Sequence, residues 1–291
     1  MRCPATAFCA RRSVAASSYI KILAPLRGVT IRTFRRTFAN AIAEYGFTEA
    51  ITPFVPAMAG VDPLKDREIG EYQANTTVQF IGKDPAALKG CLERIKESGY
   101  QTADLNCGCP FPMVRNKGRG SGLLRTPKLL EQMIKTGCET MGEGNFSVKA
   151  RIGIDRNDEL LGLMPMINAY PLRFLTVHPR TAKAMYDGEC DMAAFAKIKE
   201  AAGVRVLLNG PGGEMTGRPF IRHLGGRSDI GELLARYIEE SKAELYGERP
   251  VLGRIKELVA YWRELPYWAK RWDIIKISRS LAELEMALAG R

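Results

Sequence analysis

The sequence predicts an α/β protein: a barrel of the TIM (β/α)8 type, incomplete near its seventh and eighth strands, followed by a C-terminal α-helical domain. Seven short apolar stretches alternate with segments of helical spacing over the first 209 residues, a pattern that is typical of a parallel sheet. No dinucleotide-binding glycine motif follows the first stretch and no P-loop is present, which disfavours the doubly wound folds that use them. After about residue 226 only amphipathic helical patterns remain.

Local signals justify the barrel elements in order. Residues 19–24 are apolar and stop at Pro25, which favours a strand that ends in a loop. Apolar residues at helical spacing over 31–44 indicate the first helix. Asp84-Pro85 is typical of a helix N-cap and first turn, so we predict a helix over 86–97. The other predicted strands cover 46–52, 76–81, 101–106, 146–152, 173–178 and 204–209, and the other helices follow Thr126-Pro127 or cover 158–169 and 191–202.

The barrel pattern breaks down after the seventh predicted strand. From Asn209-Gly210 the chain passes through a segment rich in Pro and Gly and enters a helix near Pro219. A complete barrel needs a seventh helix and a full eighth strand here, and the segment is too short for both. We therefore place a shortened barrel over 19–225 and a separate helical domain over 226–291.

The helical domain combines apolar and basic residues. Amphipathic patterns cover 230–245 and 252–265, and we expect them to pack as a small bundle. Trp262, Trp268 and Trp272 lie among lysines and arginines. We expect these tryptophans to contribute to the core of the bundle and the cations to form a basic outer face that suits RNA.

Composition limits the classes of partner. The chain has 291 residues with a formal net charge of +11, from 43 Lys and Arg against 32 Asp and Glu. This excess favours an anionic partner such as nucleic acid, a cofactor phosphate or a membrane surface. No run of 18 apolar residues is present, so we expect no membrane span.

The cysteines indicate a reducing compartment. Seven Cys are scattered along the chain, unlike the dense pattern of a disulfide-stabilised domain. Cys107 and Cys109 have no second Cys or His cluster nearby, so we expect no metal site. We expect a cytoplasmic monomer with a disordered extension over residues 1–18. Because that extension has three arginines and no acidic residue, a transit peptide or an over-long start is the alternative.

One motif lies at the position where barrel enzymes have their active sites. Leu105-Asn106-Cys107-Gly108-Cys109-Pro110 ends the predicted strand 101–106, and active sites of such barrels lie at the C-terminal ends of the strands. A thiol there can donate a proton. The glycine- and cation-rich run 113–124 follows directly, and we expect it to be a mobile basic loop that holds a phosphate backbone.

Five motifs in chain order resemble the tRNA-dihydrouridine synthases, the flavin enzymes that reduce uridine in tRNA. The resemblance runs from residue 23 to the C-terminus, and the tail around 253–261 is similar to the bacterial branch that modifies a D-loop uridine. It implies FMN as cofactor, NADPH as reductant and tRNA as partner. The five motifs are 24–30 (APLRGVT), 78–82 (VQFIG), 105–110 (LNCGCP), 148–151 (VKAR), and 176–181 (TVHPRT) with Tyr186.

The resemblance assigns residues to the flavin. Ala24, Pro25 and Leu26 would contact the ring, and Gln79 would hydrogen-bond its pyrimidine edge. Lys149 is a cation in an apolar strand, where it needs a charged partner: reduced flavin, or alternatively a buried salt bridge. A structural role is the alternative for Gln79 and for His178, which would also contact the flavin. The residues implied for the flavin phosphate are Asn209, Gly210, Gly217 and Arg218.

The resemblance also assigns the catalytic and tRNA-binding residues. Cys109 would give a proton to C5 of uracil, and a positioned general acid contributes about 10²–10⁴-fold to a rate. Asn106 would orient the base, and Cys107 would be a core residue. The candidates for tRNA phosphates are Arg115, Lys117, Arg119, Arg151, Arg180 and Lys183.

The sequence departs from the family pattern where the flavin phosphate would bind. Pro211 stands where family members have an acidic residue, and about one helix and part of a strand are missing. Two alternatives therefore stay open. One is an RNA-binding protein without redox activity, and the other is an FMN-dependent barrel dehydrogenase of the dihydroorotate type.

Overall fold

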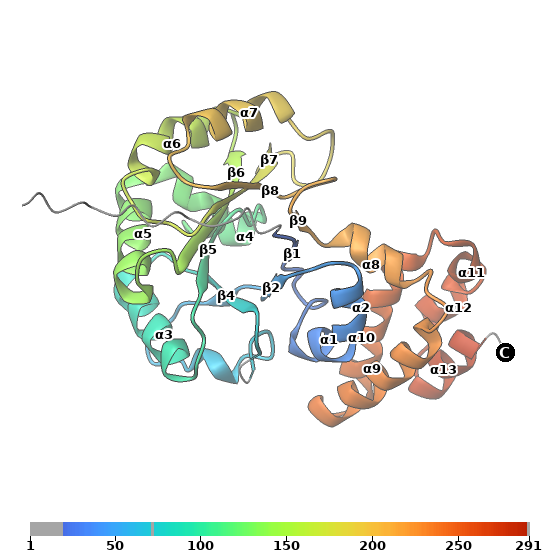
Figure 1. Cartoon of the computed structure of the whole chain (residues 1–291). Helices are drawn as coiled ribbons and strands as arrows, with labels where there is room; N and C mark the ends of the chain where they lie inside the picture. The colour runs from blue at the N-terminus through green and yellow to red at the C-terminus, as the bar shows by residue number, and fades with distance from the viewer. Residues whose placement is uncertain (1–19, 71–72, 290–291) are drawn as a thin grey trace, which may run out of the picture.

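Eight parallel strands form a nearly closed barrel in the computed structural model, which describes residues 20–70 and 73–289 (Figure 1). The predicted extension over 1–18 lies outside the described residues. Neighbouring strands follow the order β8-β7-β6-β5-β4-β2-β1-β9, and β3 pairs with β4. The strands are β1 Ile22–Leu23, β2 Glu49–Ile51, β3 Val55–Pro56, β4 Thr76–Ile81, β5 Ala103–Cys107, β6 Phe146–Gly153, β7 Leu175–Thr181, β8 Val206–Leu208 and β9 Met215–Thr216.

Helices cover the outside of the barrel (Figure 1). The predicted cap of the third helix is confirmed, because the Asp84 carboxylate accepts hydrogen bonds from the backbone N–H groups of Ala86 (2.9 Å) and Ala87 (3.2 Å). The helix after Thr126 forms without a side-chain cap. The barrel helices are α1 Arg32–Thr37, α2 Ala39–Glu44, η1 Pro63–Lys65, α3 Pro85–Glu97, α4 Pro112–Arg115, η2 Gly120–Arg125, α5 Pro127–Met141, α6 Glu159–Ile167 and α7 Met192–Ala201.

The first predicted helix is interrupted. Phe38 separates α1 from α2, with φ −96° and ψ 17°. Its ring lies 4.5 Å from that of Phe34 and 5.5 Å from that of Tyr237 (centroid distances), a residue of the C-terminal part of the chain. The interruption between α1 and α2 therefore lies where Phe38 packs against Tyr237.

The shortening at the eighth strand is confirmed, and the barrel is nevertheless nearly closed. β9 follows β8 across residues 209–214 without a helix, and it pairs with β1. An isolated parallel bridge joins Asn209 to Met215. The turn requires glycine at position 213, because a Cβ there would lie 2.3 Å from the carbonyl oxygen of Leu208. A two-residue strand thus takes the eighth position.

The two faces of the sheet have different partners. Outward residues of β4 to β7, such as Val78, Phe80 and Val148, belong to the main apolar core with the helices. Inside the barrel the apolar cluster is small, and the interior-facing residues of β4 to β7 are mostly polar. The small interior cluster consists of Ile22, Ala24, Ile51, Phe174, Leu207 and Met215.

The C-terminal helices share a core with the start of the barrel. Residues of β1, α1 and α2, among them Leu23 and Phe34, pack in one apolar cluster with residues of this helical unit. Trp262 and Trp268 are core residues, as predicted, and their indole N–H groups donate to Ile221 O (2.6 Å) and Gly225 O (2.7 Å). The unit consists of α8 Arg218–Leu224, α9 Ile230–Glu244, α10 Glu248–Val259, η3 Ala260–Trp262, α11 Pro266–Ala269, α12 Trp272–Ile277 and α13 Leu281–Ala289.

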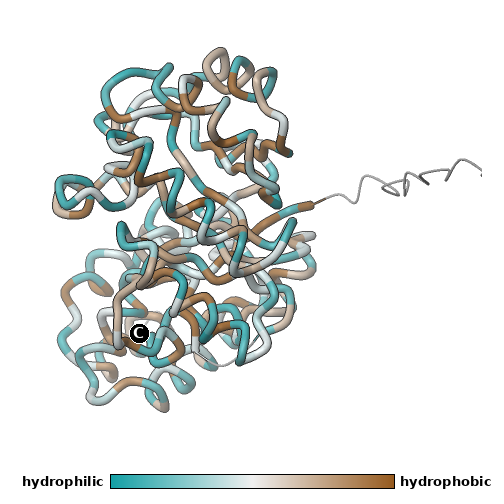
Figure 2. The backbone as a smooth tube through the Cα atoms, turned by 90° about the vertical axis from the view of Figure 1, so that its left-hand side faces the viewer, coloured by the Kyte–Doolittle hydropathy of each residue, from teal (hydrophilic) through white to brown (hydrophobic). Residues whose placement is uncertain are grey.

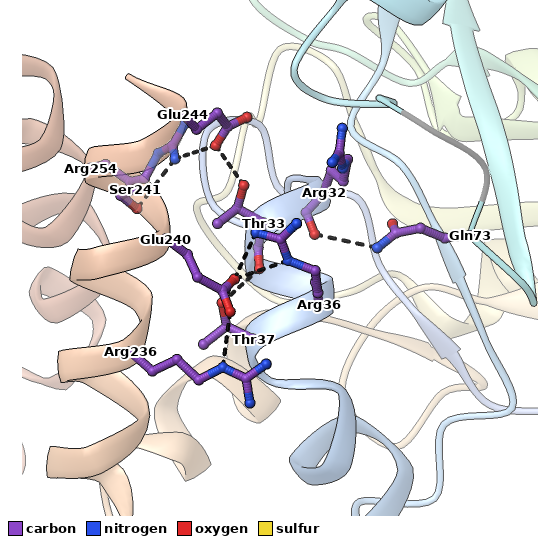
Figure 3. A network of polar contacts seen from close by, with 10 residues as sticks. All are labelled: Arg32, Thr33, Arg36, Thr37, Gln73, Arg236, Glu240, Ser241, Glu244 and Arg254. Atoms are coloured by element: carbon purple, nitrogen blue, oxygen red, sulfur yellow. Dashed lines mark hydrogen bonds and ion pairs between the residues drawn. The ribbon is translucent and has the colours of Figure 1, made fainter. Parts of the chain in front are cut away.

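Polar contacts also join α1 to α9 (Figure 3). The Glu240 carboxylate accepts from Thr37 Oγ1 (2.7 Å) and pairs with Arg36 (3.0 Å). The Glu244 carboxylate accepts from Thr33 Oγ1 (2.5 Å) and pairs with Arg254 (2.6 Å). The helical unit is therefore fixed to the barrel by apolar and polar contacts together. Hydrophobic and hydrophilic residues alternate along the helices, as the hydropathy colours of Figure 2 show. None of the helices in the described part of the chain is long and apolar enough to cross a membrane.

Candidate active site

The interior of the barrel carries a column of polar side chains. Side chains alternate along a strand, so every second residue of β4 to β7 points inward. The strand register places Gln79 beside Asp104, Asn106 beside Lys149, and Arg151 beside His178. The barrel thus brings together the polar residues that the sequence put on separate strands.

Hydrogen bonds run along this column. The Asp104 carboxylate accepts from Ser147 Oγ (2.6 Å) and from Gln79 Nε2 (2.7 Å). Gln79 Oε1 in turn accepts from Asn106 Nδ2 (2.8 Å). The Gln79 amide therefore has partners at both ends within the protein, and the flavin contact implied for it stays a prediction.

Cys109 lies at the end of the column. Asn106 Oδ1 accepts from the backbone N–H groups of Gly108 (3.1 Å) and Cys109 (2.8 Å). The carbonyl of Cys109 accepts from the N–H (3.2 Å) and hydroxyl (2.9 Å) of Ser121. Burial raises the pKa of Cys109, with Arg27, Arg151 and Lys149 acting in the opposite direction. The side chain is therefore a protonated thiol at neutral pH.

Cys107 occupies a different environment. It is fully buried among apolar residues of the outer helical layer. Burial raises its pKa far above the usual range. This environment agrees with the predicted core role.

The glycine run after Cys109 is packed and does not form an open loop. Residues 120–124 form the buried part of η2. A Cβ at Gly120 would lie 2.9 Å from Cys109 Cβ, and one at Gly122 would lie 2.3 Å from the carbonyl oxygen of Arg115. The expected mobile basic loop is therefore replaced by a structured segment that begins with α4, in which Lys117 is exposed and Arg119 is half-buried.

Two guanidiniums of this segment have unused donors. Nε of Arg115 and Nε of Arg119 are buried and have no hydrogen-bond partner among the described residues. Lys183, on the loop after β7, is exposed on the neighbouring rim. These cations are available to an anionic partner.

Lys149 is a half-buried cation that faces the column. Within residues 20–70 and 73–289 its ammonium forms no hydrogen bond and no ion pair. Burial and the charge of Arg151 lower its pKa to about 8, while Asp104 and Cys109 act to raise it. The ammonium therefore stays mostly protonated at neutral pH. The alternative of a buried salt bridge is not realised in the described residues.

His178 is neutral. It is 7% exposed, and burial lowers its pKa strongly, with the charges of Lys149 and Arg151 adding to the effect. Its Nε2 lies 3.0 Å from a guanidinium nitrogen of Arg180 and accepts from it. Arg180 also donates to Gly188 O (2.8 Å). Arg180 thus orients the imidazole.

Arg151 has a different role from the phosphate contact predicted for it. The side chain is 1% exposed, and burial lowers its pKa to about 10. Its Nε donates to Gly108 O (3.0 Å), and its NH1 donates to Thr181 O (2.8 Å) and Met185 O (2.5 Å). Arg151 therefore ties the Cys109 loop to the loop after β7.

The residues implied for the flavin ring and phosphate lie at the same end of the barrel. The backbone N–H of Ala24 donates to Thr216 O (2.8 Å). A Cβ at Gly217 would lie 3.2 Å from both Ala24 Cβ and Leu26 Cδ1. The Arg218 guanidinium lies 4.8 Å from the ring centroid of Tyr186.

The other residues of this set are only partly buried. Pro25, Asn209 and Gly210 are of intermediate exposure. Asn209 Nδ2 donates to Met215 O (3.1 Å). The short crossover thus brings Asn209 and Gly210 next to the strand that leads into Gly217.

The sequence reasoning missed Asp104. The signal was present, because this carboxylate lies two residues before Asn106 in a strand predicted to be buried, and such residues share a face. Burial raises its pKa to about 6, with the hydrogen bonds from Ser147 and Gln79 and the charge of Lys149 opposing the shift.

Similarity to known proteins agrees with this arrangement. A family model described as "Dihydrouridine synthase (Dus)" matches residues 22–212. The chain is 29% identical over 194 residues to a protein named tRNA-dihydrouridine synthase B from Vibrio vulnificus, covering 65% of this chain and 59% of that one. It is 33% identical over 191 residues to the protein of the same name from Pseudomonas aeruginosa, covering 65% and 57%.

The similarity covers only part of each relative. The chain spans about three fifths of the length of the curated relatives it matches. Among solved structures, the old yellow enzyme homologue from Zymomonas mobilis is similar, with 10% identity, a TM-score of 0.49, and coverage of 69% of this chain and 85% of that one. That similarity is too low to add to the assignment. The family model covers well over half of the chain, and the chain therefore belongs to the dihydrouridine synthase family.

Proposed function

We propose that this chain is a flavin-dependent tRNA-dihydrouridine synthase that reduces the 5,6 double bond of a D-loop uridine. One observation carries the proposal: the protonated Cys109 thiol is held at the end of a polar column that also contains the unpaired ammonium of Lys149. A proton donor and a cation are the two groups that the reaction requires from the protein.

The residues at the barrel mouth fit FMN. Lys149 has no anionic partner of its own among the described residues, and the electron-rich N1–C2 edge of a reduced flavin would satisfy its charge. Ala24, Pro25 and Leu26 offer a mainly apolar wall, and the neutral His178 offers a polar edge. Asn209, Gly210, Gly217 and Arg218 would hold the phosphate. Bound FMN, reduced by NADPH, would supply the hydride to C6 of uracil.

The protein's own groups complete the reaction. Cys109 gives its proton to C5 of the base, and the raised pKa keeps that proton on sulfur until the base is present. Asn106 is placed to orient the base, since its amide stands next to Cys109. Arg180 fixes His178 in its neutral form.

The charge of the rim supports tRNA as the substrate. The basic residues around the mouth add to a chain with a net charge of +11, and phosphate contacts dominate nucleic-acid affinity. The helical unit lies beside the barrel and extends the surface (Figure 1). The cytoplasmic location and the monomeric state stay predictions. The rim residues proposed to contact tRNA are Arg115, Lys117, Arg119 and Lys183.

A second candidate is a tRNA-binding protein without reductase activity. The short crossover over 209–214 favours it, because the flavin phosphate of such barrels is held by the loops after strands seven and eight.

Flavin content and product analysis decide between the two candidates. The purified protein is examined for flavin absorbance, and tRNA incubated with it and NADPH is analysed for dihydrouridine by mass spectrometry. The reductase gives a yellow protein and dihydrouridine. Cys109→Ala then loses most of the activity and keeps the flavin, while Cys107→Ala keeps both. A colourless protein that binds tRNA and forms no dihydrouridine supports the second candidate.

A further inference from the structure

We propose that Asp104 is a positioning residue for Cys109: through Gln79 and Asn106 it fixes the direction of a hydrogen-bond relay that ends on the backbone N–H of Cys109. Only the catalytic meaning of Cys109 rests on the proposed function. The relay itself is a property of the barrel interior.

The direction of the relay follows from the chemistry of its two ends. An ionised carboxylate only accepts hydrogen bonds, and a backbone N–H only donates them. Gln79 must therefore turn its Nε2 toward Asp104 and its Oε1 toward Asn106. Asn106 must then donate with Nδ2 and accept with Oδ1. Each amide has one orientation that satisfies all its neighbours.

Burial makes that orientation costly to change. Gln79 and Asp104 are 0% exposed and Asn106 is 7% exposed. If either amide flips, two donors or two acceptors face each other where water has little access, and unsatisfied buried polar groups are destabilising. The second carboxylate oxygen of Asp104 is held by Ser147 Oγ (2.6 Å), so the start of the relay is also fixed.

The relay acts on Cys109 through the backbone. Asn106 Oδ1 holds the N–H groups of Gly108 and Cys109, and Arg151 holds the carbonyl of Gly108. The peptide that precedes Cys109 is therefore held from both sides. Loss of the Asn106 anchor frees the thiol without unfolding the barrel.

Exchange of the carboxylate at position 104 with the amide at position 106 tests the relay. Asn106→Asp alone sets an acceptor against Gln79 Oε1. In the double variant D104N/N106D the Gln79 amide turns over: its Oε1 accepts from the new amide at 104, and its Nε2 donates to the new carboxylate at 106. The backbone N–H of Cys109 keeps an acceptor in this reversed relay. The second substitution should therefore rescue the first.

The readout is the alkylation of Cys109 by iodoacetamide in the full-length protein, measured by peptide mass spectrometry. At 7% exposure this thiol reacts through local opening. We expect N106D to react about tenfold faster, which corresponds to a coupling of about 1.4 kcal/mol between neighbouring groups. We expect D104N/N106D to return to within about threefold of the original rate.

Two controls separate positioning from general loss of structure. Cys107, which is fully buried in the main core, reports global opening, and we expect its rate to stay unchanged. Thr176→Val alters another interior side chain, whose Oγ1 is buried without a hydrogen-bond partner among the described residues. We expect it to leave the rate at Cys109 unchanged.

Several outcomes overturn the proposal. Equal alkylation of Cys109 in all variants does so, and so does a double variant that reacts as fast as N106D. If N106D does not fold, the double variant decides: a folded protein with a protected Cys109 supports the relay, and an unfolded one overturns it. None of these measurements uses flavin or tRNA, so failure of the proposed function leaves them intact.

Discussion

Replacement of Arg151 by Met tests whether this side chain holds the barrel mouth together. The substitution removes the three hydrogen bonds from the guanidinium to Gly108 O, Thr181 O and Met185 O, while Met fills much of the same volume. The three carbonyls come from the segment after β5 and from the end of β7 with the loop that follows it. Their loss therefore affects both segments.

The expected cost follows from these contacts. A hydrogen bond to a charged group contributes about 1.5–3 kcal/mol. The lower limit applies here, because burial already disfavours this guanidinium and lowers its pKa to about 10. Three bonds then give about 4–5 kcal/mol, a large part of the free energy of unfolding of a typical domain, about 5–15 kcal/mol. The melting temperature should fall by about 8 °C or more.

The assay is urea unfolding followed by circular dichroism, with Arg125→Met as the matched control. Arg125 pairs with Asp155 at 3.2 Å, and both side chains are 55% exposed. Exposed pairs contribute about 0–1 kcal/mol, so this variant should unfold almost as the original chain does. A cost for Arg151→Met no larger than that of the control would refute the inferred role of Arg151.

Three further predictions address the loop, the buried carboxylate and the rim. Gly122→Ala places a Cβ 2.3 Å from Arg115 O and should cost about 1–3 kcal/mol in urea unfolding, whereas Gly162→Ala meets nothing within 4 Å and should be neutral or stabilising. Burial raises the pKa of Asp104 from 3.8 to about 6; the folded state thus retains a proton that the unfolded state releases, so its contribution to stability falls by about 3 kcal/mol as pH rises from about 4 to about 6. Asp104→Asn should remove that part of the pH dependence of unfolding, and an unchanged dependence would contradict it. Lys117→Ala should lower the slope of log K for tRNA binding against log salt by about 0.7–0.9, measured by filter binding; an unaltered slope would show that Lys117 contacts no phosphate.

Elements with strong local signals could be predicted from the sequence. The strand predicted over 76–81 coincides with β4, and Asp84-Pro85 begins α3 as expected. In both cases the information lies within a few neighbouring residues: a stretch rich in β-branched and aromatic residues, and an N-cap. Cys109, Lys149 and His178 were identified through the family resemblance, with Cys109 and His178 at the ends of predicted strands and Lys149 within one.

Residues whose role depends on distant partners could not be predicted. Arg151 resembles a surface cation at a strand end, and its acceptors come together only when the barrel closes. In the sequence, the run around Gly120 and Gly122 resembles a flexible loop. Its close packing against Cys109 and the Arg115 carbonyl arises only in the folded chain, so the sequence alone does not indicate it. The eighth strand was missed for a similar reason. β9 has only two residues, too few to show a hydrophobic periodicity, and it is defined by its pairing with β1.

The core shared by α1 and α9 holds the helical unit in one position relative to the barrel. The contacts between Glu240 and Thr37 and the apolar cluster around Phe34 leave no linker across which the two lobes could swing. These contacts therefore fix the distance between the helical unit and Cys109. If tRNA docks on the helical unit as proposed, the nucleotide that reaches Cys109 is set by its distance along the strand from the docked part.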